Sequence, residues 1–251
     1  MSALGRVAVV LPAYNAARTL EITYRNIPHH LVDDVILVDD ASQDDTVALA
    51  RRLGIYTIAH ERNTGYGGNQ KTCYREALER GAQVVVLLHP DYQYDPAKVP
   101  EMLERLADPE TDFVFASRLL DGRALENGMP RYKYLANRFL TTVENHVLGA
   151  SFTDLHTGLR AYTRRVLETV PFERNSDGFV FDSQMIMQLH WFGFRGVEVG
   201  VPARYGGDAS STSFGASVQY GLGTLGALAN YWLCRRGLRR SPLLPAGEVR
   251  D

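Results

Sequence analysis

The sequence has few cysteines, no long apolar run and almost no net charge, and each of these absences argues against certain classes of protein. Its 251 residues contain two cysteines, Cys73 and Cys234, far apart and without a CxxC pattern, which argues against a disulfide framework or a cysteine-based zinc site. We therefore expect a reducing, cytoplasmic location. No apolar run approaches the roughly eighteen residues of a spanning helix, and the N-terminal residues lack the layout of a signal peptide. A formal net charge of -2 predicts no general nucleic-acid binding.

Short apolar runs alternate with segments of helical periodicity along the chain. Each run is too short for most helices and is rich in β-branched residues, which is typical of strands buried on both faces. The expected strands are 7–11, 35–38, 55–59, 84–88, 112–116 and 197–201. The expected helices end near residues 27, 53, 80, 106, 148, 170, 192 and 232. This alternation predicts βαβ units, and hence an α/β fold with a mainly parallel sheet flanked by helices.

The chain shows neither an internal repeat nor a linker, so we expect a single domain over residues 1–240. Its first half, 5–117, carries the regular alternation. The second half, 118–238, is less regular and contains two glycine-containing stretches, 118–131 and 203–213, which we expect to be flexible loops. Residues 241–251 are expected to form a disordered tail.

Polar residues follow the expected strands where each one ends. Asp39 and Asp40 end the second strand, while His89, Asp91 and Gln93 follow the fourth. The carboxyl ends of parallel strands share one edge, so these side chains should gather in one crevice. There, the last three could converge on a divalent cation that bridges a diphosphate. The alternative is a polar loop that merely caps the strand.

Several motifs resemble those of family 2 glycosyltransferases of the GT-A fold. They are Leu11-Pro12-Ala13-Tyr14-Asn15, Val38-Asp39-Asp40-Ala41-Ser42 and Asn63-Thr64-Gly65-Tyr66-Gly67. The segment Asp91-Tyr92-Gln93-Tyr94-Asp95-Pro96 resembles the dolichyl-phosphate mannose synthase-like branch. Ser117-Arg118, Asp154 to Arg160 and Arg204-Tyr205 extend the likeness to about residue 236. The order of these motifs implies the GT-A fold and the use of a nucleotide sugar.

The resemblance implies a donor site in the first half. Its nucleotide-binding residues would be Pro12, Ala13, Tyr14, Asn15, Asp39, Asp40, Gly67 and Lys71. Two of these have alternatives: Asp40 could form a turn with Ser42, and Lys71 could be a solvated helix residue. We reject a P-loop at 65–72, because Gln70 stands where a glycine should precede the lysine.

The implied metal ligands are His89, Asp91 and Gln93, and the implied ion is Mg²⁺ or Mn²⁺. The family's usual pattern begins with an aspartate, and His89 stands in its place. Mg²⁺ prefers oxygen ligands, whereas imidazole suits softer ions. Three alternatives stay open: His89 binds a softer ion, His89 contacts phosphate, or Asp91 and the diphosphate hold the metal.

The resemblance also implies that arginines near the two loops, Arg118 and Arg204 above all, receive the phosphate of a polyprenyl acceptor. Arg131, Lys133 and Arg138 lie in the same region. The catalytic set is then Asp91, Asp154, Arg118 and Arg204. An ionised phosphate needs no base, but a hydroxyl acceptor would, and Asp154 and Asp182 are the candidates.

The leading hypothesis is an inverting transfer of sugar from a UDP- or GDP-sugar to a polyprenyl phosphate. The apolar segment 214–232 and the arginines after it could rest on an anionic membrane, or the segment could simply pack on the sheet. Alternatives are the same donor chemistry onto a soluble hydroxyl or amine, and a nucleotide-binding module without turnover. The sugar, the base and the oligomeric state are open at this point.

Overall fold

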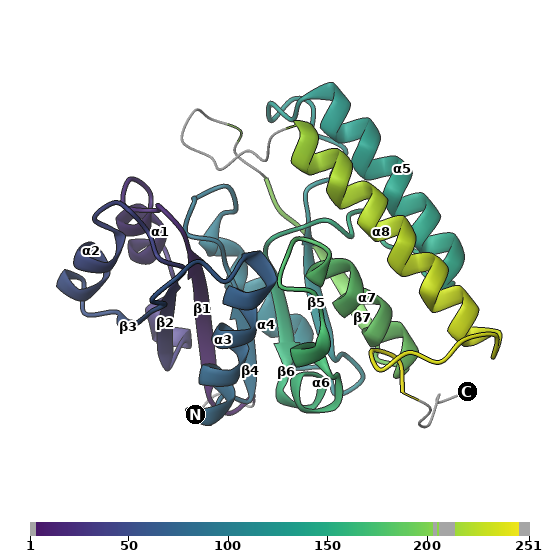
Figure 1. The fold of residues 1–251 in the computed structure, drawn as a ribbon. Coiled ribbons are helices and arrows are strands. Elements are labelled where there is room, and N and C mark those ends of the chain that lie inside the picture. The colour runs from purple at the N-terminus through teal and green to yellow at the C-terminus, as the bar shows by residue number, and fades with distance from the viewer. Residues whose placement is uncertain (1–3, 203–204, 206–213, 246–251) are drawn as a thin grey trace.

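A seven-stranded sheet carries the fold, with strand order β3-β2-β1-β4-β6-β5-β7 (Figure 1). The computed structural model describes residues 4–202, Tyr205 and residues 214–245. The strands are β1 (Val7–Ala13), β2 (Asp34–Asp39), β3 (Tyr56–Ala59), β4 (Val84–Leu87), β5 (Phe113–Ser117), β6 (Arg160–Thr163) and β7 (Gly196–Gly200). All pairings are parallel except those of β6, which is antiparallel to β4 and to β5. The expected mainly parallel sheet is confirmed.

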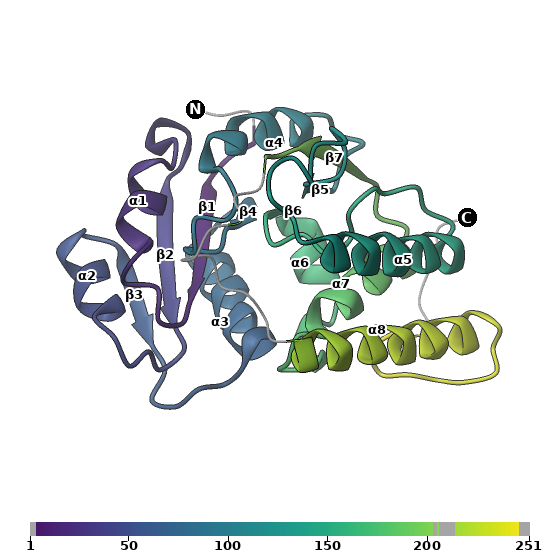
Figure 2. The ribbon, with the colours of Figure 1, turned by 90° about the horizontal axis from the view of Figure 1, so that it is seen from above.

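Helices cover both faces of this sheet because its strands are apolar on both faces. In β1, Val7 and Val9 point into one cluster of buried side chains and Ala8 and Val10 into the other, as strand geometry requires. The first face is covered by α1 (Leu20–Arg25), α2 (Thr46–Arg52) and α4 (Val99–Leu106). The second is covered by α3 (Tyr66–Glu79), α6 (Arg164–Thr169) and α7 (Phe181–Trp191). Figure 2 shows the two layers from above.

Two long helices, α5 (Arg131–Leu148) and α8 (Phe214–Arg235), lie side by side at one end of the molecule in both views. The expected helix at 214–232 is therefore present. It packs against α7 and α5, rather than directly on the sheet. Within the part of the chain that the structure describes, neither of these helices, nor any other, combines the length and the apolarity needed to cross a membrane.

The strand β6 is absent from the expected elements, and it decides what reaches the site. Its four residues carry Arg160 and Tyr162, so they lack the continuous apolar character of the other strands. Arg160 pairs with Leu87 of β4 and with Phe115 of β5. Because β6 runs antiparallel, its first residue lies at the edge where the other strands end. The segment 154–159 before it is thereby delivered to that edge.

Two loop expectations differ from the structure. Within 118–131, Leu119, Ala124 and Met129 are buried together, so this loop has a small core of its own. Residues 241–245 are packed rather than disordered, because Leu244 is buried and Trp191 donates to the carbonyl of Pro245. Most of 203–213 and all of 246–251 lie outside the described residues.

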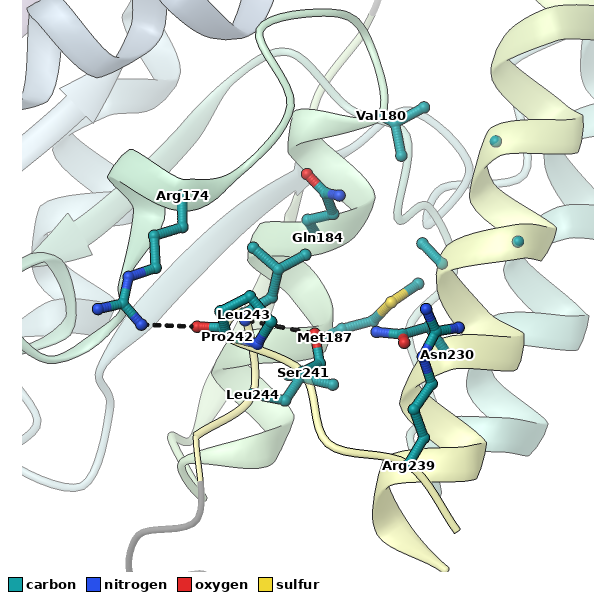
Figure 3. Close-up of a pocket in the computed structure, with 13 residues that line it drawn as sticks. Arg174, Val180, Gln184, Met187, Asn230, Arg239, Ser241, Pro242, Leu243 and Leu244 are labelled. Carbon is teal, nitrogen blue, oxygen red and sulfur yellow. Dashed lines mark hydrogen bonds between the residues drawn. The ribbon is translucent and has the colours of Figure 1, made fainter.

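A cavity of about 470 Å³ lies between α7, α8 and the C-terminal segment 239–244 (Figure 3). Arg174 donates to the carbonyl of Pro242 at its rim, and Gly223 and Gly226 form part of its wall. Its walls come from these elements and not from the loops that follow the strands, so it is separate from the site built below.

Gly67, in the first turn of α3, packs so closely against the chain after α6 that a larger residue should destabilise the fold. A Cβ there would lie 2.3 Å from the carbonyl oxygen of Ser176 and 2.7 Å from Cβ of Phe181. We expect Gly67→Ala to lower the free energy of unfolding by about 1–3 kcal/mol, because the backbone must shift. Chemical denaturation measures this.

The matched control is Gly226→Ala in α8, where a Cβ would have no atom within 4 Å. It should leave stability unchanged or raise it by up to about 1 kcal/mol, the gain expected for alanine in a helix. Equal effects of the two substitutions would contradict the close packing at Gly67.

Candidate active site

The loops after β1, β2 and β4 hold the strained backbone of the molecule. Among the described residues, the non-glycine residues with positive φ are Asn15 at 51°, Ala41 at 61° and Tyr92 at 55°. Each follows the carboxyl end of one of those strands. Such conformations are costly and concentrate where a site needs a fixed geometry. The residues with positive φ therefore lie at the same edge of the sheet as the polar residues that follow the strands.

The loops after β1 and β2 bind each other. The Asn15 N–H donates to Oγ of Ser42 at 2.7 Å, and its side-chain oxygen accepts from the Gln43 N–H at 2.8 Å. Asn15 thus caps no helix, and α1 begins only at Leu20. Asp39, which is 1% exposed, accepts from both the N–H and the hydroxyl of Ser42. The turn with Ser42 that was open to Asp40 is thus made by its neighbour Asp39, and the side chain of Tyr14 is exposed.

Asp40 instead holds the loop that leads into α3. Its Oδ1 accepts from the N–H and hydroxyl of Thr64, each at 2.7 Å, and its Oδ2 accepts from the N–H of Gly65 at 3.0 Å. His60 lies 2.9 Å from the same carboxylate. Burial opposes ionisation, but these hydrogen bonds prevail and keep the pKa of Asp40 below its usual value. An effect of Asp40 on nucleotide binding would therefore act through the shape of this loop.

Lys71 has partners other than those expected. It is buried, and its ammonium donates to the carbonyl of Asn175 at 2.5 Å and to the carboxylate of Asp177 at 2.7 Å. The N–H of Gly67 donates to the carbonyl of Asp177 at 2.7 Å. Both residues fasten α3 to the segment 175–178. This arrangement differs from both expectations for Lys71, which were contact with a phosphate and exposure to solvent.

His89 joins a buried polar network. Its Nε2 lies 3.3 Å from the hydroxyl of Tyr66, and the two rings lie parallel, within 10°. The Tyr66 hydroxyl donates to Asp182 at 2.8 Å, and Asp182 pairs with Arg160 at 3.1 Å. Burial lowers the pKa of His89 despite the nearby carboxylates of Asp91 and Asp182. His89 is therefore a neutral donor or acceptor.

The donor set fits a cation only if substrate completes it. The described residues hold no cluster of three or more His, Cys, Asp or Glu that would enclose a metal ion. Asp91 and Gln93 share a tight turn, in which the Gln93 N–H donates to Oδ1 of Asp91 at 3.0 Å. A half-buried carboxylate with an amide and an imidazole nearby suits an ion whose other ligands are phosphate and water. These residues could therefore hold a cation only together with ligands from a substrate.

A second group of polar residues centres on Arg118, which directly follows β5. Nε and Nη2 of Arg118 donate to the two carboxylate oxygens of Asp154, at 2.7 Å and 3.0 Å, and form a bidentate ion pair. Asp154 is fully buried and also accepts from the amide of Asn137 at 2.8 Å. Burial opposes its charge, but Arg118 and Asn137 lower the pKa of Asp154 to about 2. The Arg118 guanidinium is thereby held in one orientation.

Lys133 and Tyr94 connect this arginine to its surroundings. Partial burial, and then the charge of Arg118, lower the pKa of Lys133 below its usual value, so the two cations lie within reach of each other's field. The Tyr94 ring lies 5.8 Å from the Arg118 guanidinium, and its hydroxyl accepts from the N–H of Gly158. Tyr205 contacts Arg118 at 3.4 Å. Arg204 lies outside the described residues.

Sequence reasoning missed Tyr66 and Arg160. Tyr66 lies inside the glycine motif that was noticed, but only the glycines were given a role. Arg160 is 1% exposed, and its position at the start of β6 was invisible because that strand was not predicted. A buried arginine requires a buried acid, so the pair Arg160–Asp182 was the signal available.

These features match a GT-A glycosyltransferase fold: a mainly parallel sheet whose carboxyl edge carries the strained loops, an acid-containing turn and a separate cationic group. The sequence profile described as Glycosyl transferase family 2 matches residues 8–170. The chain belongs to glycosyltransferase family 2, and it is a glycosyltransferase.

Known proteins resemble the chain over most of its length. A UDP-N-acetylglucosamine–dolichyl-phosphate N-acetylglucosaminyltransferase of Methanococcus voltae is 26% identical over 181 residues, covering 65% of this chain and 72% of that protein. A polyprenol monophosphomannose synthase of Mycolicibacterium smegmatis is 28% identical over 203 residues, covering 77% and 76%.

Among solved structures, glucosyl-3-phosphoglycerate synthase of Mycobacterium tuberculosis in complex with Mn²⁺, UDP and phosphoglyceric acid matches with a TM-score of 0.70 at 20% identity. The match covers 94% of this chain and 80% of that one. It supports the fold.

The Asp154–Arg118 pair should make stability depend on acidity. The usual pKa of an aspartate is 3.8, and that of folded Asp154 is about 2. Between these values the unfolded chain binds a proton that the folded protein does not. This contribution is complete above about pH 4 and is lost as the pH falls towards 2, by about 2 kcal/mol. Denaturant unfolding of the parent and of Asp154→Asn across this range measures it.

The stability difference between parent and variant should therefore shrink as the pH falls. Glu173→Gln, which removes an exposed ion pair with Arg75, is the matched control and should keep the parent's pH dependence. A difference between parent and Asp154→Asn that stays constant from pH 5 to 2 would contradict the assignment.

Proposed function

We propose that this glycosyltransferase moves a sugar, with inversion, from a UDP- or GDP-sugar to a polyprenyl phosphate at a membrane surface. The relatives from Methanococcus voltae and Mycolicibacterium smegmatis carry dolichyl-phosphate and polyprenol acceptors in their names.

One observation carries the proposal: both carboxylates considered as a base are already bound. Asp154 is fully buried, paired with Arg118, and has a pKa of about 2. Asp182 accepts hydrogen bonds from Tyr66 and Gln70 and forms an ion pair with Arg160. A hydroxyl acceptor needs a base with a free lone pair and a pKa nearer neutrality. A phosphate acceptor, whose second pKa is about 6, is already ionised and needs only to be positioned.

The cations on this side suit such an acceptor. Within the described part of the chain, Nη1 of Arg118 makes one hydrogen bond, to the hydroxyl of Tyr205 at 3.4 Å, so it has the capacity to donate to a phosphate as well. Burial, and then the charge of Arg118, lower the pKa of Lys133 below its usual value. A phosphate dianion between the two would relieve their repulsion. In this proposal Asp154 is not a catalytic base but the residue that orients Arg118.

On the donor side, the chain's residues would place the sugar diphosphate at the strand edge. Asp91 would be the carboxylate that holds a divalent cation, together with His89 and Gln93 of the same loop. Mg²⁺ or Mn²⁺ bound there would offset the charge that develops on the departing diphosphate. The loops after β1 and β2, fixed to each other through Asn15 and Ser42, would hold the nucleoside.

The acceptor's lipid tail has a matching surface on α5 and α8. Tyr132, Leu135 and Phe139 are 51%, 66% and 60% exposed on α5, and Val218 and Leu222 are 46% and 67% exposed on α8. Spacings of three and four place each set on one face of its helix. The exposed Arg131 and Arg138 flank the set on α5. Exposed apolar side chains with neighbouring cations are typical of helices that lie on an anionic membrane.

If the acceptor is a polyprenyl phosphate bound by Arg118, transfer should require both the phosphate group and this arginine. With polyprenyl phosphate and a radiolabelled nucleotide sugar, the parent should form an extractable lipid-linked product, and it should form none with the matching polyprenol. Arg118→Ala should lower kcat/KM for the acceptor by about ten- to a hundredfold, because a charge-assisted bond is worth roughly 1.5–3 kcal/mol. Hydrolysis of the donor without acceptor should change little.

Arg25→Ala, which removes an exposed ion pair with Glu21, controls for the loss of an arginine and should behave like the parent. Parallel loss of donor hydrolysis and of transfer in Arg118→Ala would place Arg118 at the donor diphosphate instead. Transfer to the polyprenol would overturn the phosphate acceptor.

If the protein contacts membranes through α5 and α8, the exposed apolar side chains of these helices should drive its binding to lipid vesicles. Flotation with phosphatidylglycerol-containing vesicles should recover the parent, and Leu135→Glu combined with Leu222→Glu should weaken binding at least about tenfold, since each buried leucine contributes roughly 1.5–3 kcal/mol. Ile22→Glu changes a residue 45% exposed on α1 and is the control. Equal recovery of all three proteins would remove α5 and α8 as the contact.

A further inference from the structure

A chain of hydrogen bonds fixes which nitrogen of His89 carries the proton. Asp182 can only accept, and it takes the hydroxyl proton of Tyr66 at 2.8 Å. The Tyr66 oxygen, with its own proton committed, can then only accept from Nε2 of His89, 3.3 Å away. A neutral imidazole with its proton on Nε2 has its lone pair on Nδ1.

The direction of these hydrogen bonds is fixed because Asp182 is held as an anion. Arg160, 1% exposed, pairs with it at 3.1 Å, and the side-chain amide of Gln70 donates to it at 3.2 Å. A protonated Asp182 would leave the buried charge of Arg160 without a partner, which is strongly unfavourable. The carboxylate therefore stays the terminal acceptor.

The ring orientation points Nδ1 away from this network. A Cβ at Gly158 would lie 2.8 Å from Cδ2 of His89 and 3.4 Å from its Nε2, so this edge of the ring packs against the backbone of Gly158. The Tyr66 ring lies parallel to it, with centroids 5.5 Å apart. Nδ1 is on the opposite edge, and among the residues that the structure describes it has no hydrogen-bond partner.

We propose that His89 is a nitrogen ligand of the divalent cation, through Nδ1, and that Tyr66 and Asp182 are positioning residues that hold it in that tautomer. The cation itself rests on the proposed function. A ligating histidine characteristically donates its other N–H to an acceptor that fixes ring and tautomer, and the Tyr66–Asp182 pair supplies that acceptor here. The histidine in place of an acid shifts the site's preference from Mg²⁺ towards ions that accept nitrogen.

The tautomer is tested first, without any metal. In protein labelled with ¹⁵N-histidine, the His89 signals are identified by their loss in His89→Gln, since the chain has 7 histidines. A protonated Nε2 and an unprotonated Nδ1 are expected. A proton on Nδ1 would overturn the proposal. In Tyr66→Phe the preference for the Nε2–H form should fall, and an unchanged tautomer there would remove the role of Tyr66.

Ligation is tested with Mn²⁺ and UDP by electron spin-echo spectroscopy of the same labelled protein. Modulation from a histidine ¹⁵N should appear in the parent and vanish in His89→Gln. Tyr66→Phe should weaken Mn²⁺ binding about ten- to a hundredfold, the usual effect of losing a partner of a metal ligand. Tyr231→Phe removes the hydroxyl of a buried tyrosine far from the site, on α8, and should match the parent.

Metal binding and ligation by His89 can be tested separately. If Mn²⁺ and Mg²⁺ both fail to bind in the presence of UDP or GDP, the metal-dependent donor site is wrong and the ligand role of His89 falls with it. If Mn²⁺ binds with nucleotide but shows no histidine nitrogen, only the His89 assignment is overturned and the glycosyltransferase proposal stands.

Discussion

The ion pair between Arg160 and Asp182 is the constraint on which the site depends. Arg160 is among the largest fully buried side chains of the protein, and a charge so buried must be neutralised in place. It enters at the first residue of β6, between the ends of β4 and β5, so Asp182 must come to it from the start of α7. Once there, Asp182 orients Tyr66, and Tyr66 orients His89.

A second buried pair, Arg118 with Asp154, does the same on the acceptor side. In both pairs a buried acid is bound to an arginine, and the same edge of the sheet also carries a neutral histidine, the turn of Asp91 and Gln93, and cations. Cations held in fixed orientations suit a site that positions anions, and under the proposed function these anions would be the donor diphosphate and the acceptor phosphate.

The sequence sufficed for what depends on local pattern. Apolar runs and the motif at Asp91 predicted the parallel strands, the carboxyl edge and the family. It could not predict β6, because Arg160 and Tyr162 interrupt the apolar signal and only tertiary pairing makes them a strand. Nor could it assign Asp40 and Lys71, since both types bind phosphate or nucleoside in some proteins. Here their partners, Thr64 and Asp177, come from distant segments whose docking no local rule describes.

The acceptor arginine is also coupled to the helices with exposed apolar faces. Arg118 donates to the backbone carbonyl of His156 at 2.8 Å. The imidazole of His156 lies 2.7 Å from the hydroxyl of Tyr220 on α8 and 3.0 Å from the fully buried Glu144 on α5. One residue thus ties the Arg118 guanidinium to both helices, through its backbone carbonyl on one side and its imidazole on the other. Under the proposed function, a displacement of α5 or α8 against a membrane would be transmitted through His156 to Arg118, and this would link lipid contact to the positioning of the acceptor phosphate.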